Sequence, residues 1–119
     1  MVGIPRKPPE RGLAMRRCTG DGLVKLGKRL ARIDRHLVAI LAKRMSLAME
    51  VARCKINNGN EPILRKKTEE QRRAQWMAWA RQEGFDPEFA RTIFNVVLAE
   101  SCRVQIDTKE GDKARRNAR

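Results

Sequence analysis

The sequence predicts an all-α fold with one very long helix and two shorter ones. The chain has 119 residues, which is enough for one domain. Aromatic residues make up only 4% of it and there is no tyrosine, so its apolar residues are mainly aliphatic and suit helices better than sheets. Apolar residues also recur three and four positions apart, as they do on one face of a helix.

The first predicted helix begins near residues 21–23 and ends at about Ile56, before the run Asn57-Asn58-Gly59-Asn60. Its apolar positions follow a heptad pattern: Leu23, Leu26, Leu30, Ile33, Leu37, Ile40, Leu47 and Val51. A helix of about 35 residues is roughly 50 Å long, whereas a compact monomer of this size has a radius of gyration of about 13–14 Å. We therefore expect the apolar face to pack against a second copy, as a homodimer.

The two shorter helices are marked by their end signals. Pro62 interrupts the chain, and the second helix is expected over residues 64–83 with Gly84 as its stop. The run Asp86-Pro87-Glu88 supplies an N-cap, a proline in the first turn and an early acidic residue for the third helix, expected to end near Ile106. The helical domain thus covers residues 21–106. Residues 1–20 are predicted as a flexible basic arm, and residues 107–119 as a disordered basic tail.

The charge and the composition narrow the possible functions. The formal net charge is +13, and residues 21–106 alone hold 17 basic and 10 acidic residues, which favours an anionic ligand such as nucleic acid, lipid or a small acidic substrate. With His36 as the single histidine, we expect neither a metal site nor a histidine-based catalytic triad. No apolar run could span a membrane, the N-terminus has no secretory leader pattern, and three widely spaced cysteines favour a reducing, cytoplasmic setting.

Polar residues interrupt the apolar stripe of each helix. Arg44 lies on the heptad face of the first helix, and Lys55 lies on almost the same face eleven residues later. Glu69 continues a stripe of the second helix, while Ser101 and Gln105 continue a stripe of the third. A charge on a buried face needs a partner or a bound anion. Structural alternatives exist for each residue: the cations can reach water along the helix surface, Glu69 can complement the helix dipole, and Gln105 can bond the backbone.

These groups would form a small polar pocket with two cations, a carboxylate, an amide and a hydroxyl. They contain no pair of nucleophile and base. Such a set fits binding, or catalysis in which fixed donors stabilise the charge of a transition state.

The order of these residues resembles that of the all-helical (type II) chorismate mutases. The resemblance covers residues 23–106. It depends on Ile33-Asp34, on Leu41-Ala42-Lys43-Arg44-Met45, on the spacing from Arg44 to Lys55, on Glu69 after the Pro62 loop, and on Ser101 with Gln105. The resemblance implies an intertwined homodimer that rearranges chorismate to prephenate without a cofactor or a covalent intermediate.

The resemblance also implies a role for each polar residue. Arg44 would hold a substrate carboxylate, with Ser101 near a carboxylate as well. Lys55 would reach a carboxylate and the ether oxygen, which gains negative charge as the C–O bond breaks, and Gln105 would face that same oxygen. Glu69 would bind the ring hydroxyl.

Three positions depart from the family pattern. Gly27 and Thr68 stand where the family usually has arginines, and Arg65 stands where it has an aspartate. Two lost carboxylate ligands would weaken transition-state binding, since hydrogen bonds to charged groups are worth about 1.5–3 kcal/mol each. Lys28 and Arg65 are the candidate replacements, so the predicted substrate-binding set is Lys28, Arg44, Lys55, Arg65, Thr68, Glu69, Ser101 and Gln105.

Two alternative functions are kept open. Isochorismate-pyruvate lyase is a related activity in the same helical fold. The run Cys18-Thr19-Gly20, just before the first helix, resembles the sequence of those lyases. A non-catalytic basic dimer that binds nucleic acid is the alternative from another class, supported by the charge and by Arg65-Lys66-Lys67. No recognition motif for nucleic acid is visible, which argues against it.

Overall fold

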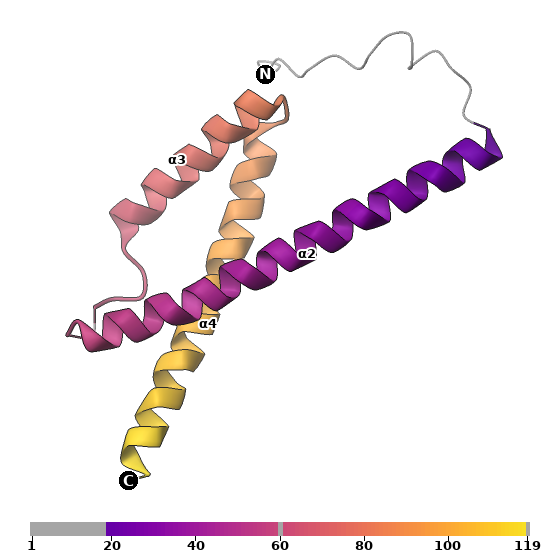
Figure 1. Ribbon diagram of the computed structural model, residues 1–119. Helices are drawn as coiled ribbons and strands as arrows, with labels where there is room; N and C mark the ends of the chain where they lie inside the picture. The colour runs from indigo at the N-terminus through magenta and orange to yellow at the C-terminus, as the bar shows by residue number, and fades with distance from the viewer. Residues whose placement is uncertain (1–18, 60, 119) are drawn as a thin grey trace. The chain divides into compact units, whose positions relative to one another are not determined.

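The computed structural model describes residues 19–59 and 61–118, and in these residues it contains three helices and no strand. Figure 1 shows them as α2 (Gly20–Asn57), α3 (Lys66–Glu83) and α4 (Pro87–Asn117). The all-α prediction is therefore confirmed. Among the described helices, none has a stretch long and apolar enough to cross a membrane. The predicted N-terminal arm lies outside the described residues, except for Thr19 and Gly20.

The chain divides into two compact units, and the boundary falls within α2, between Arg44 and Met45. The described part of the first unit is residues 19–44, and that of the second is residues 45–118.

The first unit is the N-terminal part of α2. Thr19 caps the helix, because its Oγ1 accepts a hydrogen bond from the backbone N–H of Gly22 at 3.0 Å. The helix thus begins one residue earlier than predicted and runs without a break to Asn57. Its apolar heptad residues are largely exposed in the single chain, as the exposed fractions of 61% for Leu30 and 57% for Ile33 show.

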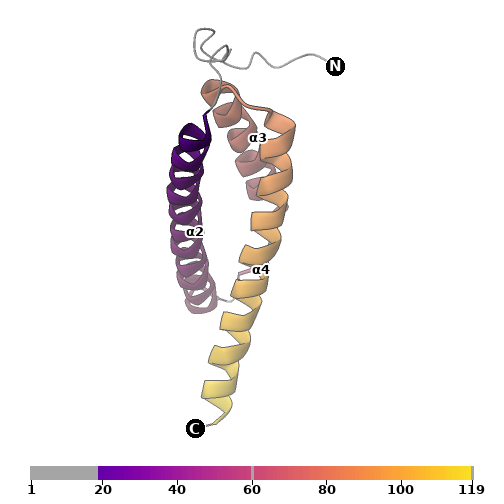
Figure 2. The same cartoon turned by 90° about the vertical axis from the view of Figure 1, so that its right-hand side faces the viewer.

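In the second unit, α3 and α4 lie side by side and are joined by a short turn (Figure 2). Gly84 ends α3 in the left-handed conformation, with φ of 79°, which glycine adopts at little cost. Asp86 caps α4 by accepting a hydrogen bond from the N–H of Glu88 at 3.0 Å, with Pro87 in the first turn. These predicted signals are confirmed, whereas α3 begins at Lys66 instead of residue 64.

The core of the second unit centres on Phe94, which is fully buried. Its ring meets that of Trp76 edge to face, with 5.2 Å between the centroids. The guanidinium of Arg73 lies 5.4 Å from the centre of the Phe94 ring, and Arg73 Nε donates to Asn95 Oδ1 at 2.8 Å. A charged residue therefore interrupts the apolar stripe of α3 because it contacts an aromatic face and an amide.

The C-terminal part of α2 presents a face of small residues. Ala48 and Ala52 are buried, while the heptad positions Leu47 and Val51 beside them remain exposed. Small side chains leave room beside the helix for longer neighbouring ones. The longer Met45 and Lys55, at the two ends of this face, both contact side chains of α4.

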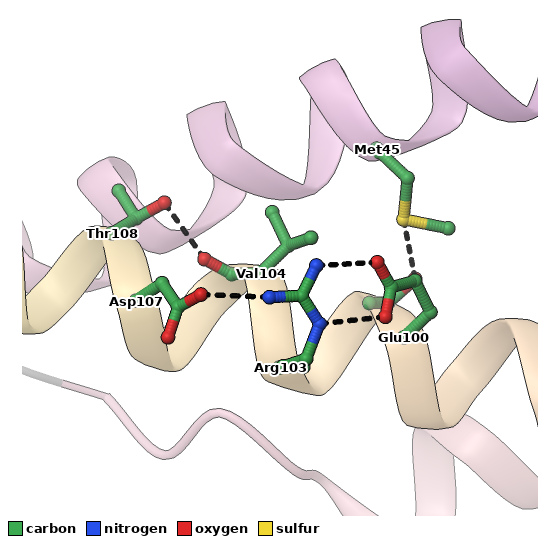
Figure 3. Close-up of polar contacts among 7 residues, drawn as sticks. Met45, Glu100, Arg103, Val104, Asp107 and Thr108 are labelled. Carbon is green, nitrogen blue, oxygen red and sulfur yellow. Dashed lines mark hydrogen bonds and ion pairs between the residues drawn. The ribbon is translucent and has the colours of Figure 1, made fainter.

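The prediction for residues 107–119 is wrong over the described range, because α4 continues as helix to Asn117 instead of ending near Ile106. Figure 3 shows interactions that support this continuation. Arg103 binds Glu100 on one side, at 2.6 and 2.7 Å, and Asp107 on the other, at 2.9 Å. The hydrogen bond from Arg103 lowers the pKa of the Glu100 carboxyl. Charge pairs three and four residues apart compensate here for the small number of apolar residues.

Candidate active site

Lys55 is the central residue of the candidate site. It lies in the last turn of α2 and is half-buried. Its ammonium donates to the backbone carbonyl of Ile63 at 2.6 Å and to Gln105 Oε1 at 3.0 Å. An ammonium has three donors, and these bonds to described residues use two of them. The loop after α2 and the middle of α4 therefore hold the charge in a defined place.

Gln105 and Ser101 are supplied by α4, one turn apart on the buried face of the helix. Their exposed fractions are 8% and 5%, although both are polar. Gln105 accepts the bond from Lys55. Ser101 Oγ lies 4.0 Å from the sulfur of Met45, a weak hydrogen bond. In the described residues, no buried side-chain nitrogen or oxygen is left without a hydrogen-bond partner. Within this unit, Lys55 and Gln105, two of the residues predicted for the polar pocket, are therefore in direct contact.

Charged groups from three segments act on Lys55. Burial lowers the pKa of its ammonium, Glu69 in the first turn of α3 raises it, and the positive charges of Lys109 and Arg65 lower it. Burial also raises the pKa of the Cys102 thiol, and Glu69 adds to that effect. Glu69 thus lies within electrostatic range of both Lys55 and Cys102, which gives the site a carboxylate beside its cation.

The remaining predicted residues differ in their settings. Thr68 is half-buried next to Glu69, whereas Arg65 is exposed and occupies the N-cap position of α3 without a side-chain cap. Arg44 and Lys28 belong to the first unit of the chain. There Arg44 is half-buried and is not without an interaction partner, while Lys28 is exposed. The second unit thus brings together Lys55, Gln105 and the charge of Glu69.

Sequence reasoning missed two parts of this arrangement. The carbonyl of Ile63 carries no side-chain signal, so that no residue pattern marks it. Lys109 is missing from the predicted set because the composition of residues 107–119 predicts a disordered tail. The signal for Lys109 was nevertheless present, since it follows Ser101 and Gln105 at the same spacing of four residues, on one face of a helix.

The arrangement can bind a small anion and can stabilise negative charge that forms during a reaction. A held ammonium and a held amide are donors of fixed direction, and fixed donors stabilise a transition state without having to reorganise. The all-helical fold and these held donors fit an enzyme site that stabilises charge without a nucleophile. The family described as chorismate mutase type II matches residues 26–106. The chain belongs to this family, and it is an isomerase with chorismate mutase activity.

One curated relative supports this assignment. The chain is similar to a 4-amino-4-deoxychorismate mutase of Streptomyces pristinaespiralis, with 28% identity over 102 residues. This alignment covers 86% of the chain and 76% of the relative. No solved structure is significantly similar to the chain.

Proposed function

We propose that this protein converts chorismate to prephenate with Lys55 and Gln105 as its catalytic residues. The observation that supports this proposal best is the hydrogen bond between Lys55 Nζ and Gln105 Oε1, 3.0 Å long. In the rearrangement the ether C–O bond breaks while a C–C bond forms within the same molecule. The ether oxygen gains negative charge, and no proton, cofactor or leaving group is needed.

Lys55 and Gln105 are suited to that charge because they are held before the substrate arrives. In this proposal the ammonium of Lys55 keeps the Ile63 carbonyl as its support and turns another donor to the ether oxygen. The side-chain amide of Gln105 donates its N–H to the same oxygen. Donors held in this way strengthen as charge develops, which lowers the barrier and not only the binding energy.

The carboxylates and the ring hydroxyl of the substrate are assigned to the other polar residues. Arg44, Lys28 and Arg65 are proposed to bind the two carboxylates, assisted by the hydroxyls of Ser101 and Thr68. Glu69 is proposed to accept a hydrogen bond from the ring hydroxyl. Glu69 suits this role because it is half-buried and lies within electrostatic range of Lys55.

A homodimer is part of the proposal, with the two chains intertwined along α2. The apolar heptad residues of residues 19–44 are exposed in the single chain, and an apolar face of this length needs a partner. A second copy would cover the same residues in both chains, as two-fold symmetry requires.

A second candidate substrate is 4-amino-4-deoxychorismate, on which the curated relative acts by its name. The two substrates differ at one ring position, where an amino group replaces the hydroxyl. The carboxylate of Glu69 can accept a hydrogen bond from either group, and it gains an ion pair if the amine is protonated. Glu69 is therefore the residue proposed to tolerate or to select the amino substrate.

The setting of the reaction is also proposed. Cys54 and Cys102 carry free thiols, which fits a reducing compartment such as the cytoplasm. With chorismate as the substrate, the reaction belongs to the shikimate pathway, as a step towards aromatic amino acids.

The test is turnover by the purified full chain with chorismate, 4-amino-4-deoxychorismate and isochorismate, with products identified by mass spectrometry. We expect prephenate from chorismate, and a loss of about 100- to 1,000-fold in kcat for Lys55→Met. Arg53→Met is the matched control, because Arg53 is exposed on the same helix two residues earlier. Its kcat should be unchanged.

Three results would contradict the proposal. Turnover of Lys55→Met at the wild-type rate would remove Lys55 from the mechanism. Faster conversion of the amino substrate would favour the second candidate. Release of pyruvate from isochorismate would indicate the lyase instead.

A further inference from the structure

The part of α4 beyond the family match contributes to the candidate site. The match ends at residue 106, whereas α4 continues to Asn117. Lys109 lies in this continuation and is half-buried. Its ammonium donates to the backbone carbonyl of Glu61 at 3.1 Å, which joins the C-terminal part of α4 to the loop between α2 and α3.

Two lysines therefore hold the same loop by backbone carbonyls two residues apart. Lys55 binds the carbonyl of Ile63 and Lys109 binds that of Glu61. The N–H of Glu61 also donates to the backbone carbonyl of Lys55 at 3.0 Å. Displacement of Glu61 would thus disturb the Lys55 backbone directly, and would disturb its ammonium through Ile63.

We infer that Lys109 is a positioning residue of the active site, which fixes the Glu61–Ile63 segment and thereby the ammonium of Lys55. This inference rests on the proposed function. Lys109 follows Gln105 by one turn on α4, so the residue that binds the Lys55 ammonium and the residue that binds its supporting loop lie on one helix face. A rigid helix between them keeps the two contacts in register.

Lys109 influences Lys55 in two ways: by its hydrogen bond to the loop and by its positive charge. The groups that influence the Lys55 pKa are Glu69, which raises it, and Lys109 and Arg65, which lower it together with burial. Cys102 completes the set and raises it. Lys55 acts as a cation, so activity falls as the pH rises through its pKa. Removal of the Lys109 charge raises that pKa and moves the alkaline fall in activity to higher pH.

The experiment compares Lys109→Met, Lys109→Arg and Lys113→Met in the full chain. Lys113 is the matched control, because it is an exposed lysine one turn further along α4. We expect Lys109→Met to lower kcat on chorismate about tenfold, as the loss of one hydrogen bond from a charged group would. The KM of Lys109→Met should change less, and the alkaline fall of its pH–activity profile should move to higher pH. Lys109→Arg should restore most of the rate. Lys113→Met should behave as the wild type.

A second measurement does not depend on turnover. Nuclear magnetic resonance of the lysine side chains gives the titration of Lys55 in the unliganded protein, with Lys55→Arg identifying its signal. An upward shift of the Lys55 titration in Lys109→Met, absent in Lys113→Met, supports the inference even if chorismate is not the substrate. An unchanged Lys55 titration together with an unchanged kcat in Lys109→Met would overturn it.

Discussion

The two units of this chain differ in whether their large apolar side chains are buried within the single chain. Residues 45–118 bury Phe94 and several alanines within their own chain, and they satisfy the polar Ser101 and Gln105 at the same time. Residues 19–44 bury none of their large apolar side chains, and Leu30 retains an exposed fraction of 61%. The unit of residues 45–118 has its own apolar core in the single chain. The unit of residues 19–44 leaves its apolar face exposed there.

Because of this difference, only some residues of the predicted site are held in place within the single chain. Lys55, Gln105 and the charge of Glu69 belong to the unit with its own core, so that their geometry depends on packing within one chain. Arg44 and Lys28 belong to the unit with the bare apolar face. We expect substrate chemistry to depend on the first group, and carboxylate binding by Arg44 and Lys28 to depend on assembly.

The largest effect is expected from a charge placed on the bare face of α2. In the proposed dimer, Leu30→Asp would cost each of the two copies about 2 kcal/mol of apolar burial, which weakens the dimer by about 4 kcal/mol, or roughly a thousandfold in its dissociation constant. Analytical ultracentrifugation measures this change. Arg32→Asp, on the opposite side of the helix, alters the charge more and should leave the dimer intact. Equal dissociation of both variants would show that charge, and not the apolar face, controls assembly.

The next effect contrasts a buried with an exposed phenylalanine on α4. Phe94→Ala should lower the free energy of unfolding by about 3–5 kcal/mol, because it removes a fully buried ring and leaves a cavity. Phe89→Ala should lower it by less than about 1 kcal/mol, because Phe89 is 57% exposed. Urea unfolding followed by circular dichroism gives both values. A loss for Phe89→Ala as large as that for Phe94→Ala would show that a partner chain covers this side of α4.

The smallest effect is expected at Gly27, inside the first unit. A Cβ built at this position meets no atom within 4 Å, so alanine fits in the single chain. Gly27→Ala should raise the free energy of unfolding by about 0.5–1 kcal/mol, because alanine favours the helix over the unfolded chain. Thermal unfolding measures the gain. Destabilisation instead would indicate that another chain approaches the backbone closely at Gly27.

The sequence was informative wherever a local signal determined the structure. Gly84 and Asp86-Pro87 marked the ends of α3 and α4, and the buried polar stripe of Ser101 and Gln105 marked the site. These features depend on residues close together in the chain, or on one helix face. For such features, periodicity and capping chemistry are sufficient.

Features that depend on distant partners were harder to predict. Residues 107–117 contain little that is apolar, yet ion pairs of Arg103 and the contact of Lys109 with Glu61 accompany their helical structure. Arg73 interrupts the apolar stripe of α3, and the residues that explain it, Phe94 and Asn95, lie on another helix. The heptad pattern of leucine and valine favoured the wrong face at this end of α2. The buried face there is the one of small residues, Ala48 and Ala52.

The length of α4 has a practical consequence for anyone who expresses this protein. A shortened chain that ends at residue 106, where the family match stops, removes Lys109 and also takes Asp107 from Arg103. Helices fray from their free ends, and Lys109 lies only about two turns from the last helical residue, Asn117. Any change that loosens the last turns of α4 is therefore expected to alter turnover through Lys109.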